Sequence, residues 1–296
     1  MDKQRTPVIE PSIRPYLSLS IGVVAISFAS IFIRLAEAPP LVIAAYRLSL
    51  ASLALAPLAL TRSRSEWKIL NRDEIGLAFG AGLFLALHFA SWITSLEYTS
   101  VASSVVLVTT HPIFVGLASH FLFNERLSPR MSMGIALSVL GGMVIGYGDF
   151  GLGQNELLGD LLATAGAVMA AGYFLIGRRL RSRLSLVAYI SLVYSTAAAT
   201  VVAFCALTGQ EFVGYPQQTY LMFILLALVP QLIGHSSLNW ALRYLSATFV
   251  SVSILGEPIG STILAYFFLN EVPTPHKIMG GVLILAGIYI ASREQK

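Results

Sequence analysis

Charged residues are scarce in this chain. They make up 11% of its 296 residues, whereas soluble domains carry about 25% charge, and apolar residues make up 56%. The mean hydropathy is +0.75. A chain of this composition has too little polar surface to cover a water-soluble body of its size. The composition therefore excludes an ordinary soluble protein and predicts that the chain is embedded in a bilayer.

Cysteine is almost missing, and the common catalytic motifs are missing altogether. Cys205 is the single cysteine, so the chain forms no intramolecular disulfide and no cysteine-based metal motif. The sequence has no Gly-rich phosphate loop, no paired-histidine metal motif and no nucleophile elbow. We therefore predict that the protein is not an enzyme and uses no cofactor or metal. Most of its basic residues lie in gaps between apolar runs, which argues against a nucleic-acid partner.

Long apolar runs fill most of the chain, and a spanning helix needs about 20 such residues. The first run follows a polar segment and has no obvious cleavage site, which predicts an anchored helix and not a removed signal peptide. We expect ten transmembrane helices, over Tyr16–Ala36, Pro40–Leu60, Ile75–Ser95, Ser100–Phe123, Met131–Tyr147, Leu158–Ile176, Leu186–Leu207, Tyr220–Leu242, Ala247–Leu269 and Ile278–Ala291.

Lys and Arg residues are distributed unequally between the two ends of these helices. With the N-terminus inside, 16 of the 19 basic residues lie on the inner side. The exceptions are Arg34, Arg47 and Lys277. Because basic residues are enriched in cytoplasmic loops, we predict a multi-pass protein of the plasma (inner) membrane with both termini in the cytoplasm.

One stretch of the sequence occurs twice. Residues 96–141 align without a gap onto residues 242–287, 146 positions further on, with 14 of 46 positions identical. A repeat at half the chain length indicates an architecture of two similar units. Five helices per unit is an odd number, so the second unit must enter the membrane the opposite way. The sequence predicts two five-helix inverted repeats, residues 1–150 and 151–296, with a substrate site between them.

Four segments resemble the EamA type of the drug/metabolite transporter superfamily: "SLEYTSVASSVVLVTTHPIF", "FLFNERLSP", "FFLNEVPTP" and "KIMGGVLILAGIYIA". The resemblance extends over nearly the whole chain. It implies export of amino acids or other small metabolites, and a central cavity lined mainly by helices 1, 3, 4, 6, 8 and 9. The repeated Glu125 and Glu271 precede helix starts, and we interpret them as structural.

Two ionisable residues occupy equivalent positions in the two units. His111 precedes Pro112, and Glu257 precedes Pro258. Proline removes a helix hydrogen bond, so we expect helix bends at both sites and another at Pro230. A titratable side chain beside a bend at membrane depth predicts a site for a proton or a substrate. The alternative is that both residues are hydrogen-bonded packing residues, or that they pair with each other or with Arg47.

Arg47 lies about two turns inside the second predicted helix, where a charge is costly. It is a candidate ligand for a substrate carboxylate, and the alternative is a structural pair with helix-terminal carbonyls or Glu257. Arg34 lies near a helix end, from which its side chain can reach the interface.

Polar and aromatic side chains on other helices complete the predicted site. His88 and Trp92, and likewise His235 and Asn239, are four residues apart and share a helix face. Together they offer polar groups beside aromatic surface, which suits an amphipathic solute. The alternative is buried histidines with interfacial tryptophans. Further substrate-binding candidates are Trp240, Thr110 and Tyr173, with Thr109 as a weaker one.

These features predict a secondary transporter that exports a small organic metabolite, such as an amino acid, by alternating access. Because no nucleotide-binding domain is present, coupling must use a gradient, and we expect proton exchange at Glu257 and His111. Alternatives are an uncoupled facilitator, an importer, or a membrane sensor or scaffold without transport. The expected partners are the solute and the lipid bilayer, and a homodimer is compatible with the sequence.

Overall fold

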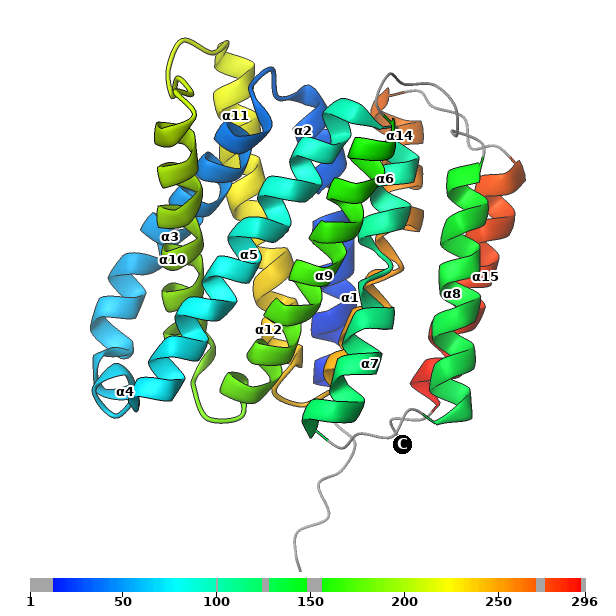
Figure 1. Cartoon of the computed structure of the whole chain (residues 1–296), viewed down its shortest axis with the longest axis horizontal. Coiled ribbons are helices and arrows are strands. Elements are labelled where there is room, and N and C mark those ends of the chain that lie inside the picture. The colour runs from blue at the N-terminus through cyan, green and yellow to red at the C-terminus, as the bar shows by residue number, and fades with distance from the viewer. Residues whose placement is uncertain (1–12, 100, 124–127, 148–155, 270–274, 294–296) are drawn as a thin grey trace, which may run out of the picture.

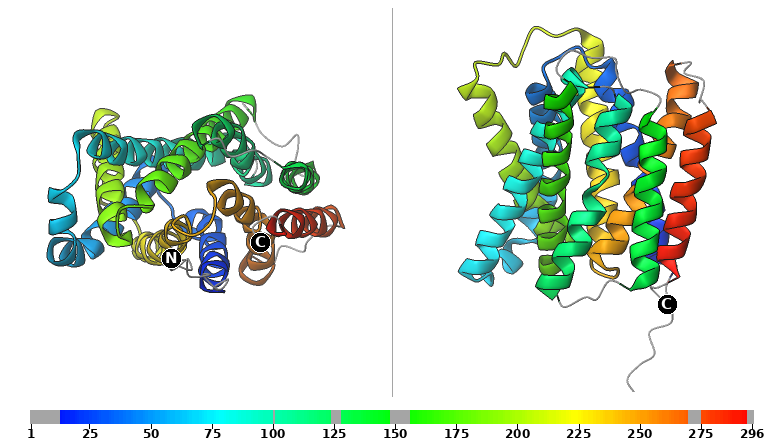
Figure 2. Two further views of the ribbon diagram at one scale, coloured as in Figure 1. Left: turned by 90° about the horizontal axis from the view of Figure 1, so that it is seen from below. Right: turned by 45° about the vertical axis from the view of Figure 1, so that its right-hand side comes forward.

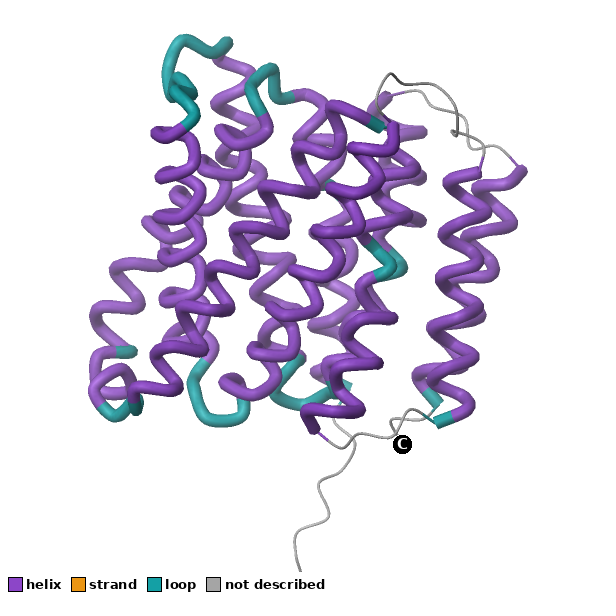
Figure 3. Tube along the Cα trace, in the orientation of Figure 1, coloured by secondary structure: helices purple, strands orange, loops and turns teal. Residues whose placement is uncertain are grey.

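The structure is a computed structural model, and it describes residues 13–99, 101–123, 128–147, 156–269 and 275–293. Every regular element in these ranges is helical, and they contain no strand (Figure 3). The elements are α1 (Arg14–Ser27), α2 (Ala29–Leu35), α3 (Pro40–Arg62), α4 (Arg64–Lys68), α5 (Arg72–Tyr98), α6 (Val101–Val108), α7 (His111–Phe123), α8 (Pro129–Tyr147), α9 (Glu156–Arg181), α10 (Leu186–Leu207), α11 (Gln217–Leu226), the π-helix η1 (Ala227–His235), α12 (Ser236–Ala241), α13 (Ala247–Ile254), α14 (Glu257–Leu269) and α15 (Pro275–Ser292). The predicted all-α class is confirmed for these residues.

Most of these helices combine into rods long enough for a bilayer. Within the described ranges, seven helical stretches are long and apolar enough to cross a membrane: Arg14–Leu35, Pro40–Arg62, Arg72–Tyr98, Leu157–Arg181, Leu186–Leu207, Gln217–Ala241 and Ala247–Phe268. Two shorter apolar helices cover His111–Leu122 and Ile278–Ala291. The total of ten spans stays a prediction.

Several helix starts follow from local sequence signals. Asn71 and Glu74 form a reciprocal capping box at the start of α5, with backbone-to-side-chain distances of 2.8 and 3.1 Å. Ser128 accepts a hydrogen bond from the Met131 N–H at 3.1 Å, and α8 begins at Pro129, as the Ser-Pro pair predicts. Glu125 and Glu271 lie outside the described residues.

The outer surface of the bundle is strongly apolar. Leu53, Phe79, Leu117 and Phe267 are between 54% and 71% exposed, and many other large apolar side chains are exposed on the same helices. Extended apolar surface of this kind marks contact with a membrane or a partner. On helices of spanning length, such a surface is typical of an integral membrane protein.

Helix boundaries recur at the spacing of the sequence repeat. α6 covers Val101–Val108 and α13 covers Ala247–Ile254, which lie 146 residues further on. The starts of α7 and α14, at His111 and Glu257, have the same separation. Figure 3 shows such a helix interruption about half-way along the bundle. The repeat therefore extends from the sequence to the places where helices begin and end.

The last helices of the two units, α8 and α15, pack side by side at one edge of the bundle (Figures 1 and 2). A methyl group on Gly141 would lie 2.6 Å from the Gly280 carbonyl oxygen, and one on Gly287 would lie 2.6 Å from the Gly134 carbonyl oxygen. Gly141 and Gly287 are equivalent positions of the repeat, and so are Gly134 and Gly280, so each contact is the repeat equivalent of the other. Contacts that interchange in this way are typical of a two-fold relation between the two helices.

The midpoint of the same contact involves a residue and its own repeat equivalent. Ser138 Oγ donates to the Ile284 carbonyl at 3.3 Å, and these residues are 146 positions apart. A two-fold axis brings equivalent residues together where it passes through a contact, so the axis passes close to this hydrogen bond. Glycine is required around it because the backbones approach closely.

The end of the bundle that carries α4 is joined by polar contacts. Arg183 forms an ion pair with Glu74, and Glu66 accepts a hydrogen bond from the Ser185 N–H at 2.7 Å. Arg178 and Arg181, from the end of α9, donate to the carbonyls of Leu242 and Asn239 at 3.0 Å each. Basic side chains at helix C-terminal carbonyls are favourable. These contacts hold α5, α9, α10 and α12 together at this end.

Candidate functional site

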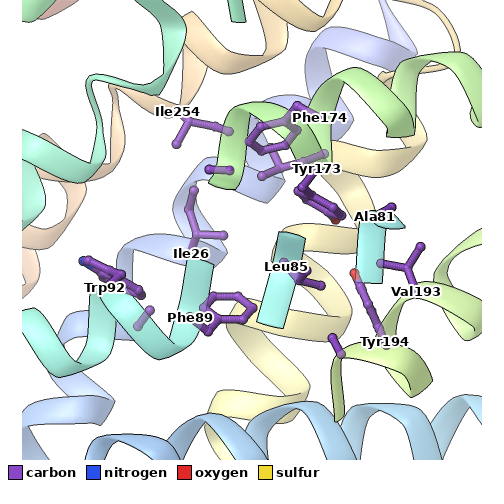
Figure 4. Close-up of a cluster of buried hydrophobic side chains, with 14 of the residues drawn as sticks. Ile26, Ala81, Leu85, Phe89, Trp92, Tyr173, Phe174, Val193, Tyr194 and Ile254 are labelled. Carbon is purple, nitrogen blue, oxygen red and sulfur yellow. The ribbon is translucent and has the colours of Figure 1, made fainter. Parts of the chain in front are cut away.

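A small cavity lies between the helices, where the two helix interruptions meet the middle of α3, α5 and α9. Its lining comes from Ile26, Ala29, Arg47, His88, Phe89, Trp92, Val108, Thr109, His111, Ala170, Tyr173, Phe174, His235, Leu238, Ile254 and Glu257. Figure 4 shows part of this lining, with Phe89 and Trp92 on α5 and Tyr173 and Phe174 on α9. The cavity volume of about 40 Å³ has room for water but not for an amino acid.

Arg47 is the charged centre of this cavity. Its side chain is 1% exposed, its Nε donates to Gln231 Oε1 at 2.8 Å, and its guanidinium carbon lies 4.0 Å from the centre of the Phe89 ring. Its Nη1 is buried without a hydrogen-bond partner among the described residues. A buried polar group without a partner is costly, so this N–H is a donor ready for an incoming oxygen.

Glu257 lines the same cavity but forms no ion pair with Arg47. Within the described residues, the only carboxylate–cation pair closer than 4.0 Å is Arg183–Glu74. The predicted alternative, in which Arg47 pairs with Glu257, is therefore not what the structure shows. The amide of Gln231 takes that place. One basic and one acidic side chain face the cavity, and each keeps bonding capacity for a ligand.

His111 lies at the first interruption and is fixed by its own helix. It is 4% exposed, its Nδ1 lies 3.1 Å from the Val108 carbonyl oxygen, and its ring stacks on Phe174 with centres 5.6 Å apart. Pro112 cannot donate to the Val108 carbonyl, which lies four residues earlier, and the histidine ring satisfies it instead. His111 Nε2 is buried without a partner among the described residues.

The three predicted proline bends take two forms. Pro112 and Pro258 are each the second residue of a new helix, and the interruptions lie at the preceding residues 109–110 and 255–256. Pro230 instead lies within η1, where the backbone hydrogen bonds have π-helical spacing. Both arrangements relieve the missing proline N–H without a sharp bend in a continuous α-helix.

His88 and Trp92 of α5 lie along the cavity with stacked rings, whose centres are 6.0 Å apart. His88 Nδ1 lies 3.0 Å from the Gly166 carbonyl oxygen. Trp92 is 4% exposed, and its Nε1 has no hydrogen-bond partner in the described part of the chain. The two side chains thus form an aromatic wall with one free donor.

His235, Asn239 and Tyr173 form a second polar group. The Asn239 amide donates to the Tyr173 hydroxyl and, at 2.7 Å, to the His235 carbonyl. Asn239 is fully buried but does not itself line the cavity, so it positions Tyr173, which does. His235 lies against the Phe89 ring at 5.3 Å, and its Nδ1 is unpartnered among the described residues.

Three residues considered in the sequence analysis lie away from the cavity lining. Thr110 donates to the Leu107 carbonyl at 2.6 Å, whereas its neighbour Thr109 lines the cavity. Trp240 packs against Tyr244, with ring centres 4.6 Å apart. Arg34 is exposed at the end of α2.

The sequence analysis missed Gln231. Its side chain is fully buried, its Oε1 holds Arg47, and its Nε2 has no partner in the described residues. It lies in η1, and π-helical segments are frequent at functional sites. An amide beside Pro230 in an otherwise apolar run was the available signal, because polar side chains at membrane depth are rarely without a role.

An apolar outer surface, spanning helices and a buried cavity with opposite charges define a multi-pass integral membrane protein of the transporter class. A sequence profile of the EamA-like transporter family matches the chain twice, over residues 13–147 and 157–293. The chain therefore belongs to this family, in the drug/metabolite transporter superfamily, and it is a transporter and not an enzyme.

Curated relatives and a solved structure agree with this membership. The chain is 26% identical to "Uncharacterized transporter YdfC" of Bacillus subtilis, over 92% of this chain and 88% of that protein. It is 28% identical to "Pseudopaline exporter CntI" of Pseudomonas aeruginosa, over 77% and 78%. It is 25% identical to a "Probable terminal-alkyne amino-acid exporter" of Streptantibioticus cattleyicolor, over 84% and 82%. A crystal structure with 20% identity shares the fold, with a TM-score of 0.78 over 95% of this chain and 97% of that one.

Proposed function

We propose that this protein is a secondary transporter that exports an amino acid or a related small metabolite by alternating access. The observation that carries the proposal is the buried guanidinium of Arg47, which turns a free N–H toward a cavity that also contains Glu257. A membrane protein without transport has no need of two costly charges beside a cavity. Two relatives whose names state an exported amino acid or pseudopaline support this substrate class.

The proposed architecture has ten transmembrane helices in two five-helix inverted repeats, residues 1–150 and 151–296. The two family matches, the recurring helix boundaries and the interchanged glycine contacts of α8 and α15 support it. Exchange of the two repeat conformations then converts one access state into the other. The small cavity corresponds to an occluded state that must widen to admit a solute.

The proposed location is the plasma (inner) membrane, with both termini in the cytoplasm. The support is the basic end of the bundle, where α4 carries Arg64 and Lys68, the end of α9 carries Arg178, and Arg183 follows α9. In Figure 1 this is the lower side, and α15 also ends there. The excess of basic residues makes this the cytoplasmic side.

Within the site, Arg47 binds the carboxylate of the solute in bidentate geometry. The rings of Trp92, Tyr173 and Phe174 enclose its side chain. Of the two predicted carriers for proton exchange, His111 and Glu257, we propose Glu257, because the His111 ring already bonds the Val108 carbonyl. An uncoupled facilitator or an importer remains the alternative within transport, and it differs only in the response to an imposed gradient.

Counterflow in proteoliposomes tests this function. Vesicles with purified protein and an unlabelled amino acid inside are mixed with trace amounts of the labelled compound, for each of the common L-amino acids. We expect transient accumulation of at least one of them, and Arg47→Ala abolishes it. If no solute accumulates under any gradient, the transporter assignment of this site is wrong. Accumulation that ignores an imposed pH gradient supports the facilitator.

A further inference from the structure

We propose that Glu257 binds a proton and the cationic group of the solute alternately, never both together. His111 has a structural role only, as the cap of the carbonyl at the end of α6. This inference rests on the proposed function and deepens it. It predicts that solutes with both a carboxylate and an ammonium group exchange against protons. Solutes with a carboxylate alone leave the proton on Glu257 and are not exchanged against it.

The two interruptions differ in how their free carbonyls are satisfied. At the first, the His111 ring caps the Val108 carbonyl, three residues earlier, at 3.1 Å. At the second, the equivalent Ile254 carbonyl has no hydrogen-bond donor among the described residues. Pro258 cannot supply one. Glu257 occupies the sequence position equivalent to His111, and its carboxyl has an O–H donor when protonated and none when ionised.

The groups that share the cavity with Glu257 set its charge preference. Arg47 comes from α3, His88 from α5, His111 from α7, Tyr173 from α9 and His235 from η1. Within the described lining, α1, α2, α6, α12 and α13 contribute no titratable side chain. The α15 residues, packed against α14, are not among the lining residues. Only Arg47 and Glu257 therefore carry opposite charges in this space when the histidines are neutral.

Charge balance then decides which ligands the cavity accepts together. A zwitterion places its carboxylate on Arg47 and its ammonium on an ionised Glu257, so the loaded cavity is neutral. The ammonium takes the place of the proton, and the proton moves from the carboxyl oxygen of Glu257 to water on the open side of the cavity. After the solute departs, a proton returns to Glu257, whose O–H donates to the Ile254 carbonyl. Solute and proton thus exclude each other, which is the requirement for exchange.

The same balance gives a measurable electrical signature. The loaded cavity carries no net charge, whereas the returning cavity holds ionised Arg47 and a neutral Glu257, and so carries one positive charge. Exchange of a zwitterion against a proton therefore moves charge, and an inside-negative potential drives export. A carboxylate without an ammonium neutralises Arg47 itself and leaves Glu257 protonated in both directions, so its transport moves no proton and carries only the charge of the anion.

Proton release on binding tests this inference directly. The probes are L-phenylalanine, which suits the aromatic lining, and its desamino analogue 3-phenylpropionate. If the counterflow screen finds another amino acid faster, that compound and its desamino acid take their place. They are added to purified protein in weakly buffered solution with a pH dye, near neutral pH. We expect the amino acid to release up to one proton per protein and the desamino acid to release none.

Variants separate this mechanism from its competitors. In Glu257→Gln, we expect no proton release, at least tenfold weaker binding of the amino acid and unchanged binding of 3-phenylpropionate. Glu211→Gln, an exposed loop residue, is the matched control. His111→Asn keeps a donor for the Val108 carbonyl, and we expect the same number of protons per bound solute.

Counterflow of an amino acid without proton release overturns the inference but leaves the proposed transport function intact. Loss of proton release in His111→Asn also overturns it, and absence of any counterflow overturns both.

Discussion

The interruption between α6 and α7 and the one between α13 and α14 occupy equivalent positions, yet their hydrogen bonding differs. In the first, Thr109, Thr110 and His111 bond to the carbonyls of Val105, Leu107 and Val108 at 2.6 to 3.1 Å. In the second, the equivalent residues are Leu255, Gly256 and Glu257. Leucine and glycine have no side-chain donor, and Glu257 has one only when protonated.

The difference suggests a division of labour between the two halves. Side-chain bonds fix the first interruption in one geometry, because the Val108 carbonyl, which Pro112 leaves without a donor, has a partner in His111. The second keeps an acceptor without a donor and adds the backbone freedom of Gly256. The repeat contains two similar interruptions. We infer that the interruption between α6 and α7 is rigid, whereas the one between α13 and α14 responds to a ligand.

The largest expected effect is at Glu257. Glu257→Gln should abolish accumulation driven by a pH gradient, because an amide cannot exchange a proton. The measurement is uptake of the labelled solute into proteoliposomes with and without an imposed pH gradient. Equal stimulation in the variant and the wild type would remove Glu257 from coupling and erase the functional difference between the interruptions.

Arg47 ranks second. Arg47→Gln removes the guanidinium but keeps a polar group beside Gln231. Loss of one partner of a buried charged contact costs roughly 2–5 kcal/mol, so the Kd for a carboxylate solute should rise at least tenfold. Calorimetric titration measures it. Arg47→Lys should recover little, since an ammonium lacks the bidentate fork. An unchanged Kd would show that Arg47 has a structural role only.

The α8–α15 contact tests whether the two halves are equivalent where they should be. Gly141→Ala and Gly287→Ala each place a methyl group 2.6 Å from a carbonyl oxygen of the facing helix. Overpacking of this kind costs roughly 1–3 kcal/mol, and we expect the larger loss in Gly287→Ala, whose methyl group would also collide with Ser138 Oγ. Cys205, the only cysteine, is fully buried, so its reaction with a maleimide dye on heating reports unfolding.

Gly76→Ala is the matched control for these two variants. A Cβ at Gly76 meets nothing within 4 Å, so this substitution should not lower the unfolding temperature. A Gly141→Ala or Gly287→Ala protein as stable as Gly76→Ala would contradict the close approach of the two helix backbones at this contact.

Removal of the cap at the first interruption should cost stability but little coupling. His111→Leu leaves the Val108 carbonyl without a donor, at roughly 1–3 kcal/mol. His111→Asn should restore most of the loss, because its amide nitrogen can occupy the place of Nδ1. The unfolding temperature by the same dye assay decides this. A His111→Leu protein as stable as the wild type would show that the cap contributes nothing.

The smallest effect is expected at Arg34, which is exposed at the end of α2. Arg34→Gln should change stability by no more than about 0.5 kcal/mol and leave counterflow rates unchanged. A large loss of transport would place Arg34 on the solute pathway and show that residues at the helix ends, and not only those at the two interruptions, contact the solute.

Local sequence signals predicted the helices well but not their interruptions. The predicted span Pro40–Leu60 corresponds to α3, and Ser128-Pro129 marks the start of α8. The predicted span Tyr220–Leu242 is divided into α11, η1 and α12. Apolar composition indicates that a segment is helical in lipid, but it hardly distinguishes α-helical from π-helical hydrogen bonding.

The sequence by itself determined the class of the protein, its internal repeat and the placement of unlike titratable residues before equivalent prolines. These follow from composition, register and the chemistry of proline, which need no knowledge of neighbouring helices. The tertiary structure alone decided that Arg47 meets Gln231, 184 positions away, and that Trp240 lies off the cavity while Asn239 supports Tyr173. It also decided that His111 caps the Val108 carbonyl, whereas the Ile254 carbonyl has no donor among the described residues. Helix rotation and packing select these partners, and a linear pattern does not encode which faces meet.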